Sequence, residues 1–361
     1  MALPTTARAR AEQFCEIYGL QIPVLMAPMA GACPPALAAA VANAGGMGAC
    51  GVLLMQPDAI ADWVKQIRGA SNGAFQLNNW VPDAAPARDG AHETRLREFL
   101  GEWGPKVAAE AADKAPAAFD AQCEAIFAAG PRAVSSIMGV FSPDMVQRLK
   151  AQGIAWFATV TTVAEARVAQ SAGADVIVAQ GMEAGGHRGA FEAADAGSAL
   201  VGLFSLLPAV VDAVHVPVVA TGGIGDARGV AAAMTLGASA VQIGTGLLRS
   251  PEAAIAPAWA DAIGVARPEG TITTRAFSGR LGRSIATAYA RAANQPDAPE
   301  PAPYPIQRNL TQALRDSGTK TNDISRIQAW AGQSAGLARA APAADIVTTL
   351  WADASALLPA V

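Results

Sequence analysis

The chain is poor in the residues that build metal centres and disulfide frameworks. Its 361 residues include only three histidines and four cysteines, and no cysteines are spaced as C-x-x-C. Zinc sites need clusters of such ligands, and disulfide frameworks need closely patterned cysteines. We therefore expect no metal site. We expect the cysteines to be reduced thiols of a cytoplasmic protein; they are Cys15, Cys33, Cys50 and Cys123.

Charge and long apolar runs are scarce as well. Charged residues make up 16% of the chain and the net charge is −4, so the charge gives no reason to expect binding to nucleic acid or to an anionic membrane. No uninterrupted apolar stretch is long enough to span a bilayer. Residues Met1–Arg10 carry two arginines without an apolar segment behind them, which argues against a secretory signal. We expect neither nucleic acid nor membrane as a partner.

Hydrophobic residues, by contrast, make up 52% of the chain, enough for a large buried core. Eight short apolar runs lack polar alternation, which predicts strands buried on both faces, as in a parallel sheet. The runs are Pro23–Met29, Met47–Gly51, Ala74–Trp80, Ala133–Met138, Ala155–Thr161, Asp175–Gln180, Pro217–Thr221 and Ala240–Gly244.

Alanine-rich stretches with helical spacing follow most of these strands. The clearest are Pro34–Ala44, Ser142–Gln152, Thr162–Gly173, Gly197–Val214 and Asp226–Gly237. Glycines stand where helix C-caps belong, at Gly45, Gly153, Gly173 and Gly237. Eight strand–helix units predict an α/β fold of the (β/α)₈ TIM-barrel type. An open doubly wound sheet is the alternative, because strand order cannot be read from one sequence.

Two stretches interrupt this alternation. The polar segment Pro82–Glu102 is longer than an ordinary connection, and we place it as an insertion at the barrel mouth. Residues 247–333 lack strand–helix alternation and predict a smaller, mainly helical second domain over the mouth. Residues 1–246 and 334–361, with a closing helix over Ala344–Leu357, then form the barrel domain.

The carboxyl ends of the predicted strands carry the residues suited to chemistry, because TIM barrels build their active sites there. The sixth strand runs into Gln180 and a glycine-rich loop that holds Gly181, Gly185 and one imidazole, His187. Glycines let the backbone approach a flat ligand, and the imidazole is a candidate acid or base. The alternative is a surface loop whose histidine has no chemical role.

Glycine-rich turns follow the seventh and eighth strands. In barrels such turns form a phosphate site from backbone N–H groups. The donors here would be Gly222, Gly223, Gly244 and Thr245. The alternative for the first turn is a tight turn followed by a helix cap at Asp226. The spacing is not that of a dinucleotide-binding fingerprint.

The polar groups expected across the mouth are amides, namely Asn78, Gln180 and Gln242. Amides both donate to and accept from a planar heteroaromatic ring, and Met26 and Met29 offer apolar contact. This set suits an isoalloxazine ring better than a sugar. Asn78 has a second interpretation, as a turn former at the end of its strand.

Taken in order, these segments resemble the nitronate monooxygenases, formerly 2-nitropropane dioxygenases, and most of all their class I branch. The resemblance rests on M-A-P-M-A-G, the asparagine after the third strand, A-Q-G-M-E-A-G-G-H-R-G, A-T-G-G-I, Q-I-G-T and a final W-A-G-Q-S-A-G-L-A-R. It implies a (β/α)₈ barrel that binds FMN without a covalent bond. It also implies one-electron oxidation of alkyl nitronates, such as propionate 3-nitronate, with dioxygen to an aldehyde or semialdehyde and nitrite.

The resemblance also implies residue roles. Gly222, Gly223, Gly244 and Thr245 would hold the FMN phosphate, with Gln242 near it, and His187 would face the substrate. The flavin ring and ribityl chain would be lined by Ala27, Met29, Asn78, Gln180, Gly181 and Gly185. Arg188 would either pair with an anion or face solvent, and Tyr304 would reach the flavin. The pair Asn79-Trp80 departs from the expected small or apolar pair, which alters the expected pocket shape.

Three functions fit these observations. The first is a nitronate monooxygenase, with a nitronate and dioxygen as its small-molecule partners. Such an enzyme could act as a homodimer. The second is an FMN-dependent NAD(P)H:quinone or enoyl-acyl-carrier-protein reductase of the same superfamily. The third is a non-catalytic binder of a phosphorylated ligand.

Overall fold

The computed structural model describes residues 5–359 of the chain. Residues 1–4, part of the segment considered above for a secretory signal, and residues 360–361, the end of the expected barrel domain, lie outside this range. Within residues 5–359, no helix has both the length and the apolar character that crossing a membrane requires.

Eight parallel strands form the centre of the molecule, in the order β1-β9-β8-β6-β5-β4-β3-β2. They are β1 (Val24–Met26), β2 (Gly48–Gly51), β3 (Phe75–Trp80), β4 (Ala133–Ile137), β5 (Ala155–Val160), β6 (Val176–Gln180), β8 (Val218–Thr221) and β9 (Ala240–Ile243). The ring closes between β1 and β2: Met26 N–H donates to the Met47 carbonyl at 2.9 Å, and Met47 N–H to the Val24 carbonyl at 3.1 Å. This closure confirms the TIM barrel and excludes the open sheet.

All eight predicted strands are present, with shifted ends. The largest shift is in the first strand, which was expected to reach Met29 but ends at Met26. Ala27 N–H still donates to the Ile243 carbonyl at 2.8 Å, but the next residue, Pro28, has no N–H to continue the ladder. The chain therefore leaves the sheet at Ala27.

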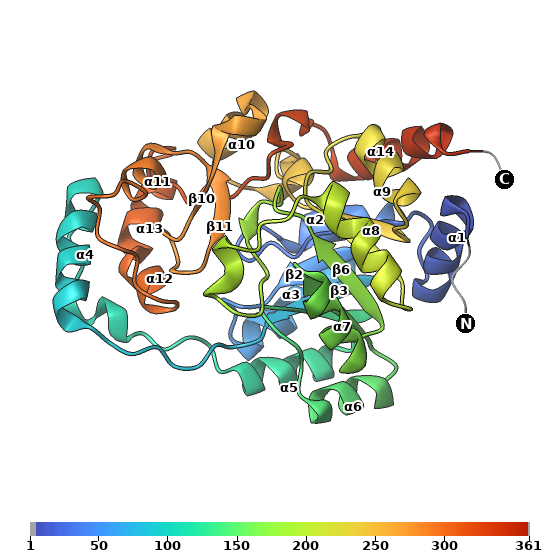
Figure 1. Cartoon of the computed structure of the whole chain (residues 1–361), viewed down its shortest axis with the longest axis horizontal. Coiled ribbons are helices and arrows are strands. Elements are labelled where there is room, and N and C mark those ends of the chain that lie inside the picture. The colour runs from blue at the N-terminus through green and yellow to red at the C-terminus, as the bar shows by residue number, and fades with distance from the viewer. Residues whose placement is uncertain (1–4, 360–361) are drawn as a thin grey trace.

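Helices surround the barrel (Figure 1). They are α2 (Pro35–Asn43), α3 (Pro57–Ala70), α5 (Phe119–Ala129), α6 (Pro143–Ala151), α7 (Val163–Ser171), α8 (Leu203–Ala213), α9 (Ala227–Thr235) and α14 (Ala343–Leu357). Helix α8 was expected from Gly197 but begins at Leu203, where the Glu183 carboxylate accepts the Leu203 N–H at 2.9 and 3.0 Å. Because the Glu183 carboxylate binds the first N–H group of the helix, it fixes Leu203 as the residue where α8 begins.

An additional helix, α1 (Ala7–Tyr18), was not predicted and covers the amino end of the barrel. Its Tyr18 ring lies 5.0 Å from the Phe157 ring and Phe14 lies 6.2 Å from it, within a buried cluster to which the amino ends of the strands contribute. The amino end is thus filled with aromatic side chains, and ligands must enter from the opposite end.

A second region lies beside the barrel (Figure 1). Its helices are α4 (Gly90–Trp103), α10 (Pro257–Val265), α11 (Ala288–Ala292), α12 (Ile306–Leu310) and α13 (Gln312–Lys320). It also contains a three-stranded antiparallel sheet in the order β10-β11-β7. The strands are β10 (Thr271–Thr274), β11 (Gly282–Ile285) and β7 (Gly186–His187). The sheet was not predicted. Leu96 and Leu100 of α4 share a buried cluster with Phe277 and Tyr289, so the insertion packs into this region. The two-domain division itself stays a prediction.

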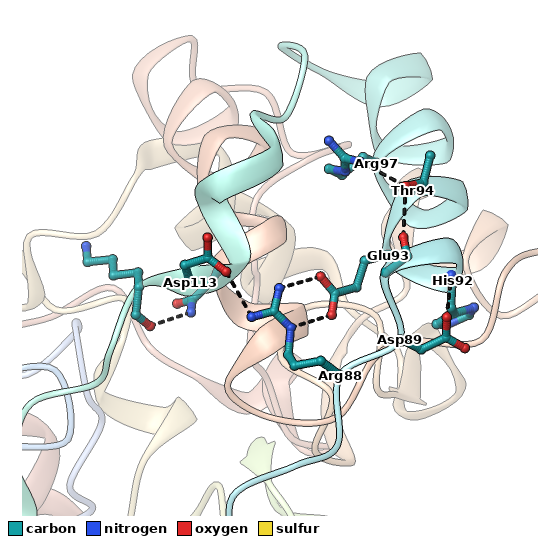
Figure 2. A network of polar contacts seen from close by, with 10 residues as sticks. Arg88, Asp89, His92, Glu93, Thr94, Arg97 and Asp113 are labelled. Atoms are coloured by element: carbon teal, nitrogen blue, oxygen red, sulfur yellow. Dashed lines mark hydrogen bonds and ion pairs between the residues drawn. The ribbon is translucent and has the colours of Figure 1, made fainter.

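The segment that leads from the barrel into α4 is fastened by charged side chains (Figure 2). Arg88 donates to both carboxylate oxygens of Glu93, at 2.6 and 2.7 Å, and to Asp113 at 2.9 Å. Asp89 caps α4 by accepting the His92 N–H at 2.9 Å. These bonds tie the crossing chain to α4 and to the 3₁₀ turn Ala109–Asp113, which fixes where α4 enters the second region.

Candidate active site

His187 lies where the barrel and the second region meet. It belongs to β7, which leaves the end of β6 and pairs with β11 through Gly282. Its Nε2 is 2.8 Å from the Ser278 hydroxyl, and its ring lies between Trp80 at 4.9 Å and Trp330 at 5.1 Å. The imidazole is therefore held by the second region while it stands over the carboxyl ends of the barrel strands.

The imidazole of His187 is neutral at ordinary pH. Burial and, to a lesser extent, the positive charges of Arg280, Arg308 and Arg315 together lower its pKa to about 3. The side chain keeps a small exposed surface. A neutral ring offers one N–H donor and one lone pair but carries no charge of its own.

The two predicted phosphate turns lie together at the barrel mouth. Gly222 and Gly223 have φ of +100° and +72°, which glycine adopts without strain. The N–H groups of Gly222, Gly223, Gly244 and Thr245 find no acceptor among residues 5–359. Four unused backbone donors on two adjacent strand ends make a cradle suited to an anion.

The walls of this cradle leave little room for side chains. A Cβ on Gly222 would lie 3.0 Å from Ala184, and one on Gly244 would lie 3.3 Å from the Ala27 Cβ and 3.6 Å from the Met29 sulfur. One carboxylate, Glu183, also stands beside the turn. Its oxygens are engaged at the start of α8, and it is close enough to raise the pKa of Arg188 and Arg283. These two arginines offset its charge.

The segment after Trp330 packs over the phosphate turns, a role that was not predicted for it. Gly332 N–H donates to the Thr245 hydroxyl at 3.0 Å, and Gln333 N–H donates to the Glu183 carbonyl at 2.9 Å. A Cβ on Gly185 would lie 2.6 Å from the Ala331 carbonyl carbon and 2.6 Å from the Gly332 nitrogen. The predicted site segments around Gly185 and Thr245 therefore form one packed unit with the segment around Gly332.

The three predicted amides have different surroundings. Asn78 donates to the carbonyl and hydroxyl of Ser135, at 3.2 and 3.0 Å. Gln180 donates to the His187 carbonyl at 3.0 Å and accepts the Gly189 N–H at 2.8 Å, so its amide holds the histidine loop in place. Gln242 accepts from Gln76 at 3.3 Å. All three are nearly buried, and their roles toward a flavin stay predictions.

Of the two interpretations of Arg188, the solvent-facing one was wrong, and its role as an anion partner stays a prediction. Its side chain is buried rather than solvent-facing, and its donors go to carbonyl oxygens, including those of Thr161 at 3.2 Å and Ala199 at 3.0 Å. Burial lowers its pKa to about 10, so it remains protonated at neutral pH. Arg188 thus anchors the loop that carries His187, while its buried Nε–H has no acceptor within the described residues.

Aromatic rings form a wall beside His187. Trp80 stacks on Tyr304 with centroids 4.7 Å apart and an interplanar angle of 17°. Arg280 lies over the Trp80 ring at 5.8 Å and is paired with Asp83. The pair noted at Asn79-Trp80 thus divides between two sides of the strand. Asn79 is buried near Cys123, and Trp80 presents a large flat ring toward His187.

Sequence reasoning missed Ser278, Arg280 and Trp330. Ser278 and Arg280 stand in the segment F-S-G-R before β11, and only the long-range pairing of β11 with β7 brings them to His187. The β-branched run Thr271–Thr274 was the available signal for a strand there.

Two further observations concern a possible metal ion and a cleft near the site. Among residues 5–359, no group of three or more His, Cys, Asp or Glu side chains is placed to hold a metal ion. A cleft of about 300 Å³ opens between α9 and α14, lined by Gly225, Arg228, Arg339 and Asp353 among others. It borders the predicted phosphate turn at Gly225, and Arg228 is already paired with Asp226.

Comparisons with known proteins agree on one family. The family model described as "Nitronate monooxygenase" matches residues 11–353. A nitronate monooxygenase of Paraburkholderia phytofirmans is 37% identical over 92% of this chain and 92% of its own, and one of Pseudomonas aeruginosa is 36% identical over 94% and 98%. A solved structure of nitroalkane oxidase from Streptomyces ansochromogenes has a TM-score of 0.86 at 33% identity, covering 95% of this chain and 98% of that one. FabK from Thermotoga maritima has a TM-score of 0.75 at 27% identity, covering 96% of both chains.

The neutrality of His187 can be tested by NMR on the protein as purified. Because the folded pKa is about 3, the imidazole signals of His187 should not titrate between pH 5 and 8. The unfolded ring takes up a proton below about 6.5, so this residue lowers the stability of the fold as pH falls from about 6.5 toward 3. His92 and His215 are internal comparisons in the same spectrum. A His187 midpoint between pH 6 and 7 would contradict the assignment.

Proposed function

Because the chain belongs to the nitronate monooxygenase family, we propose that this oxidoreductase binds FMN and oxidises alkyl nitronates, such as propionate 3-nitronate, with dioxygen to aldehyde or semialdehyde and nitrite. The observation that carries the proposal is the joint placement of an anion cradle and a neutral histidine at one barrel mouth. Family membership makes a flavin the expected cofactor, and the cradle favours FMN in particular.

The residues present fit FMN. The unused N–H groups of Gly222, Gly223, Gly244 and Thr245 would donate to the phosphate, and Ala27 and Met29 place an apolar surface beside Gly244. In this proposal the space between the cradle and His187 is lined by Asn78, Gln180, Gly181, Gly185 and Gln242. The bound flavin would supply the acceptor for the electron that leaves the nitronate.

His187 would bind and orient the substrate. The Ser278 hydroxyl has two acceptors in reach, the His187 Nε2 at 2.8 Å and the Arg280 carbonyl at 3.3 Å. Donation to the nearer one leaves the proton of the imidazole on Nδ1, where it can donate to a nitronate oxygen.

The lowered pKa of His187 also bears on the form of the substrate. A nitronate is already an anion, so no proton has to be removed from it. A neutral nitroalkane would need a base, and an imidazole with a pKa of about 3 is a weak one. We therefore propose nitronates, rather than neutral nitroalkanes, as the substrates. Water would be excluded from this side of the His187 imidazole by the aromatic rings of Trp80, Trp330 and Tyr304.

Replacement of Gly223 by aspartate tests the phosphate cradle. The added carboxylate would repel the phosphate and occupy its space, so Gly223→Asp should retain less than about a tenth of the wild-type flavin. Gly101→Asp is the matched control, because Gly101 lies on α4 with no atom within 4 Å of an added Cβ. Flavin content per protein, measured by absorbance after denaturation, is the readout. Wild-type content in Gly223→Asp would place the phosphate elsewhere.

The function itself is tested by anaerobic mixing of the flavin-loaded protein with propionate 3-nitronate, and separately with NADH and NADPH. We expect the visible flavin spectrum to change rapidly with the nitronate and not with the pyridine nucleotides. On admission of air, nitrite should appear. Rapid bleaching by NADH or NADPH without any response to the nitronate would assign the protein to the reductase alternative, and flavin without any turnover would favour a binding protein.

A further inference from the structure

Two cysteine side chains lie in contact near the carboxyl ends of the first two strands. Cys33 stands between β1 and α2, Cys50 lies in β2, and their sulfur atoms are 3.9 Å apart. Both side chains are buried, and the Cys50 sulfur also lies 3.7 Å from the Met55 sulfur. The proposed function makes no use of this pair, although all four cysteines of the chain are free thiols.

The surroundings of Cys33 favour its thiolate form. Gly51 N–H donates to the Cys33 sulfur at 3.3 Å, and the amino end of α2 follows directly in the chain. The hydrogen bond with the Cys50 thiol lowers the pKa of Cys33 against the effect of burial, and the backbone at Gly51, Met29 and Ala32 adds to this lowering. The same hydrogen bond and burial raise the pKa of Cys50. Cys33 is therefore the more reactive thiol of the pair.

The other two cysteines have different surroundings. Cys15 on α1 and Cys123 on α5 are buried, and burial raises the pKa of each thiol to about 11. Thiols of this kind stay protonated at neutral pH, whereas the thiolate is the form that reacts with oxidants. The chain thus holds one activated thiol with a second thiol beside it, which is the arrangement of a sensor cysteine and its resolving partner.

The loop that ends at Cys33 also forms one side of the anion cradle. Ala32 N–H donates to the Met29 carbonyl at 2.7 Å, and the Met29 sulfur would lie 3.6 Å from a Cβ on Gly244. The Cys33 carbonyl accepts the Trp63 indole N–H at 2.9 Å. Because the loop is held by these bonds, a displacement of Cys33 would also move the backbone that lies against Gly244.

A disulfide between the two cysteines requires such a displacement. Its sulfur atoms would be about 2.05 Å apart, so the side chains must approach each other by about 2 Å. Cys50 is held in the sheet, where β2 pairs with β3 and Cys50 lies opposite Leu77. Most of the movement therefore falls on the loop at Cys33.

We propose that Cys33 and Cys50 are a site of reversible oxidation, at which hydrogen peroxide converts the two thiols to a disulfide and thereby weakens the binding of FMN. The effect on FMN rests on the proposed function, whereas the formation of the disulfide does not. Transient disulfides of this kind sense oxidants in reducing compartments.

The oxidation takes place in two steps. The Cys33 thiolate attacks one oxygen of the peroxide, the O–O bond breaks, and the leaving hydroxide takes up the proton lost by Cys33 to form water. The Cys50 sulfur then attacks the sulfur of the Cys33 sulfenic acid, the S–O bond breaks, and hydroxide leaves with the Cys50 proton as a second water. The two thiols lose two electrons, which reduce one peroxide to two waters.

The first test counts thiols in the full chain before and after treatment with hydrogen peroxide. All four cysteines should react with a thiol reagent after denaturation of the reduced protein, whereas only Cys15 and Cys123 should react after oxidation. Dithiothreitol should restore the other two, because it reduces a disulfide but not a sulfinic acid. No lysine or arginine lies between Cys33 and Cys50, so the linked peptides are prepared with chymotrypsin and identified by mass spectrometry.

The second test measures the Kd for FMN by quenching of flavin fluorescence. Oxidation should raise the Kd about fivefold or more, as for other coupled sites, and dithiothreitol should reverse the change. Cys33→Ser and Cys50→Ser should form no disulfide and should keep the Kd of the reduced protein after peroxide. Cys123→Ser is the matched control, since it removes a buried cysteine on α5 and should respond like the wild type.

The outcomes separate this inference from the proposed function. Four reactive thiols after peroxide treatment, or a link through Cys15 or Cys123, would overturn the oxidation site. A disulfide between Cys33 and Cys50 with an unchanged Kd would overturn its coupling to the cradle. If the disulfide forms in a protein that binds no FMN, the proposed function falls and the oxidation site stands. If a serine variant does not fold, the comparison of oxidised and reduced wild type carries the test.

Discussion

The pairing of β7 with β11 is the interaction on which the site depends. It is a short antiparallel contact, Gly282 with His187 and Arg283 with Gly186, between a barrel loop and the second region. Without it the imidazole of His187 would lose the contacts with the second region that orient it. With it the imidazole reaches Ser278 and lies between two tryptophans. The barrel thus supplies the position of the site, and the second region supplies its orientation.

This contact requires backbones to approach closely. A Cβ on Gly282 would lie 3.0 Å from the Gly186 carbonyl and 2.9 Å from the Trp330 ring, and a Cβ on Gly185 would meet the backbone at residues 331–332. The glycines of the histidine loop were interpreted as space for a flat ligand. At Gly185 the structure shows a second use, because the absence of a side chain lets the loop and the segment after Trp330 touch.

The sequence was sufficient for the barrel because buried parallel strands are apolar throughout and their helices end in glycine. Gly45, Gly153, Gly173 and Gly237 all have positive φ, as a helix C-cap requires. It was also sufficient to locate the two glycine turns. It was not sufficient for Arg188, since only the fold shows that carbonyls surround the guanidinium. Nor could it reveal Ser278, which reaches His187 through a contact between distant segments.

The central claim is that one mouth holds both an anion cradle and a neutral histidine, with the flavin between them. The most direct measurement is a crystal structure of the protein with FMN bound. The account predicts that the phosphate accepts N–H groups of Gly222, Gly223, Gly244 and Thr245, and that the ring system lies against His187. A phosphate in the cleft between α9 and α14, or a ring system away from His187, would contradict it.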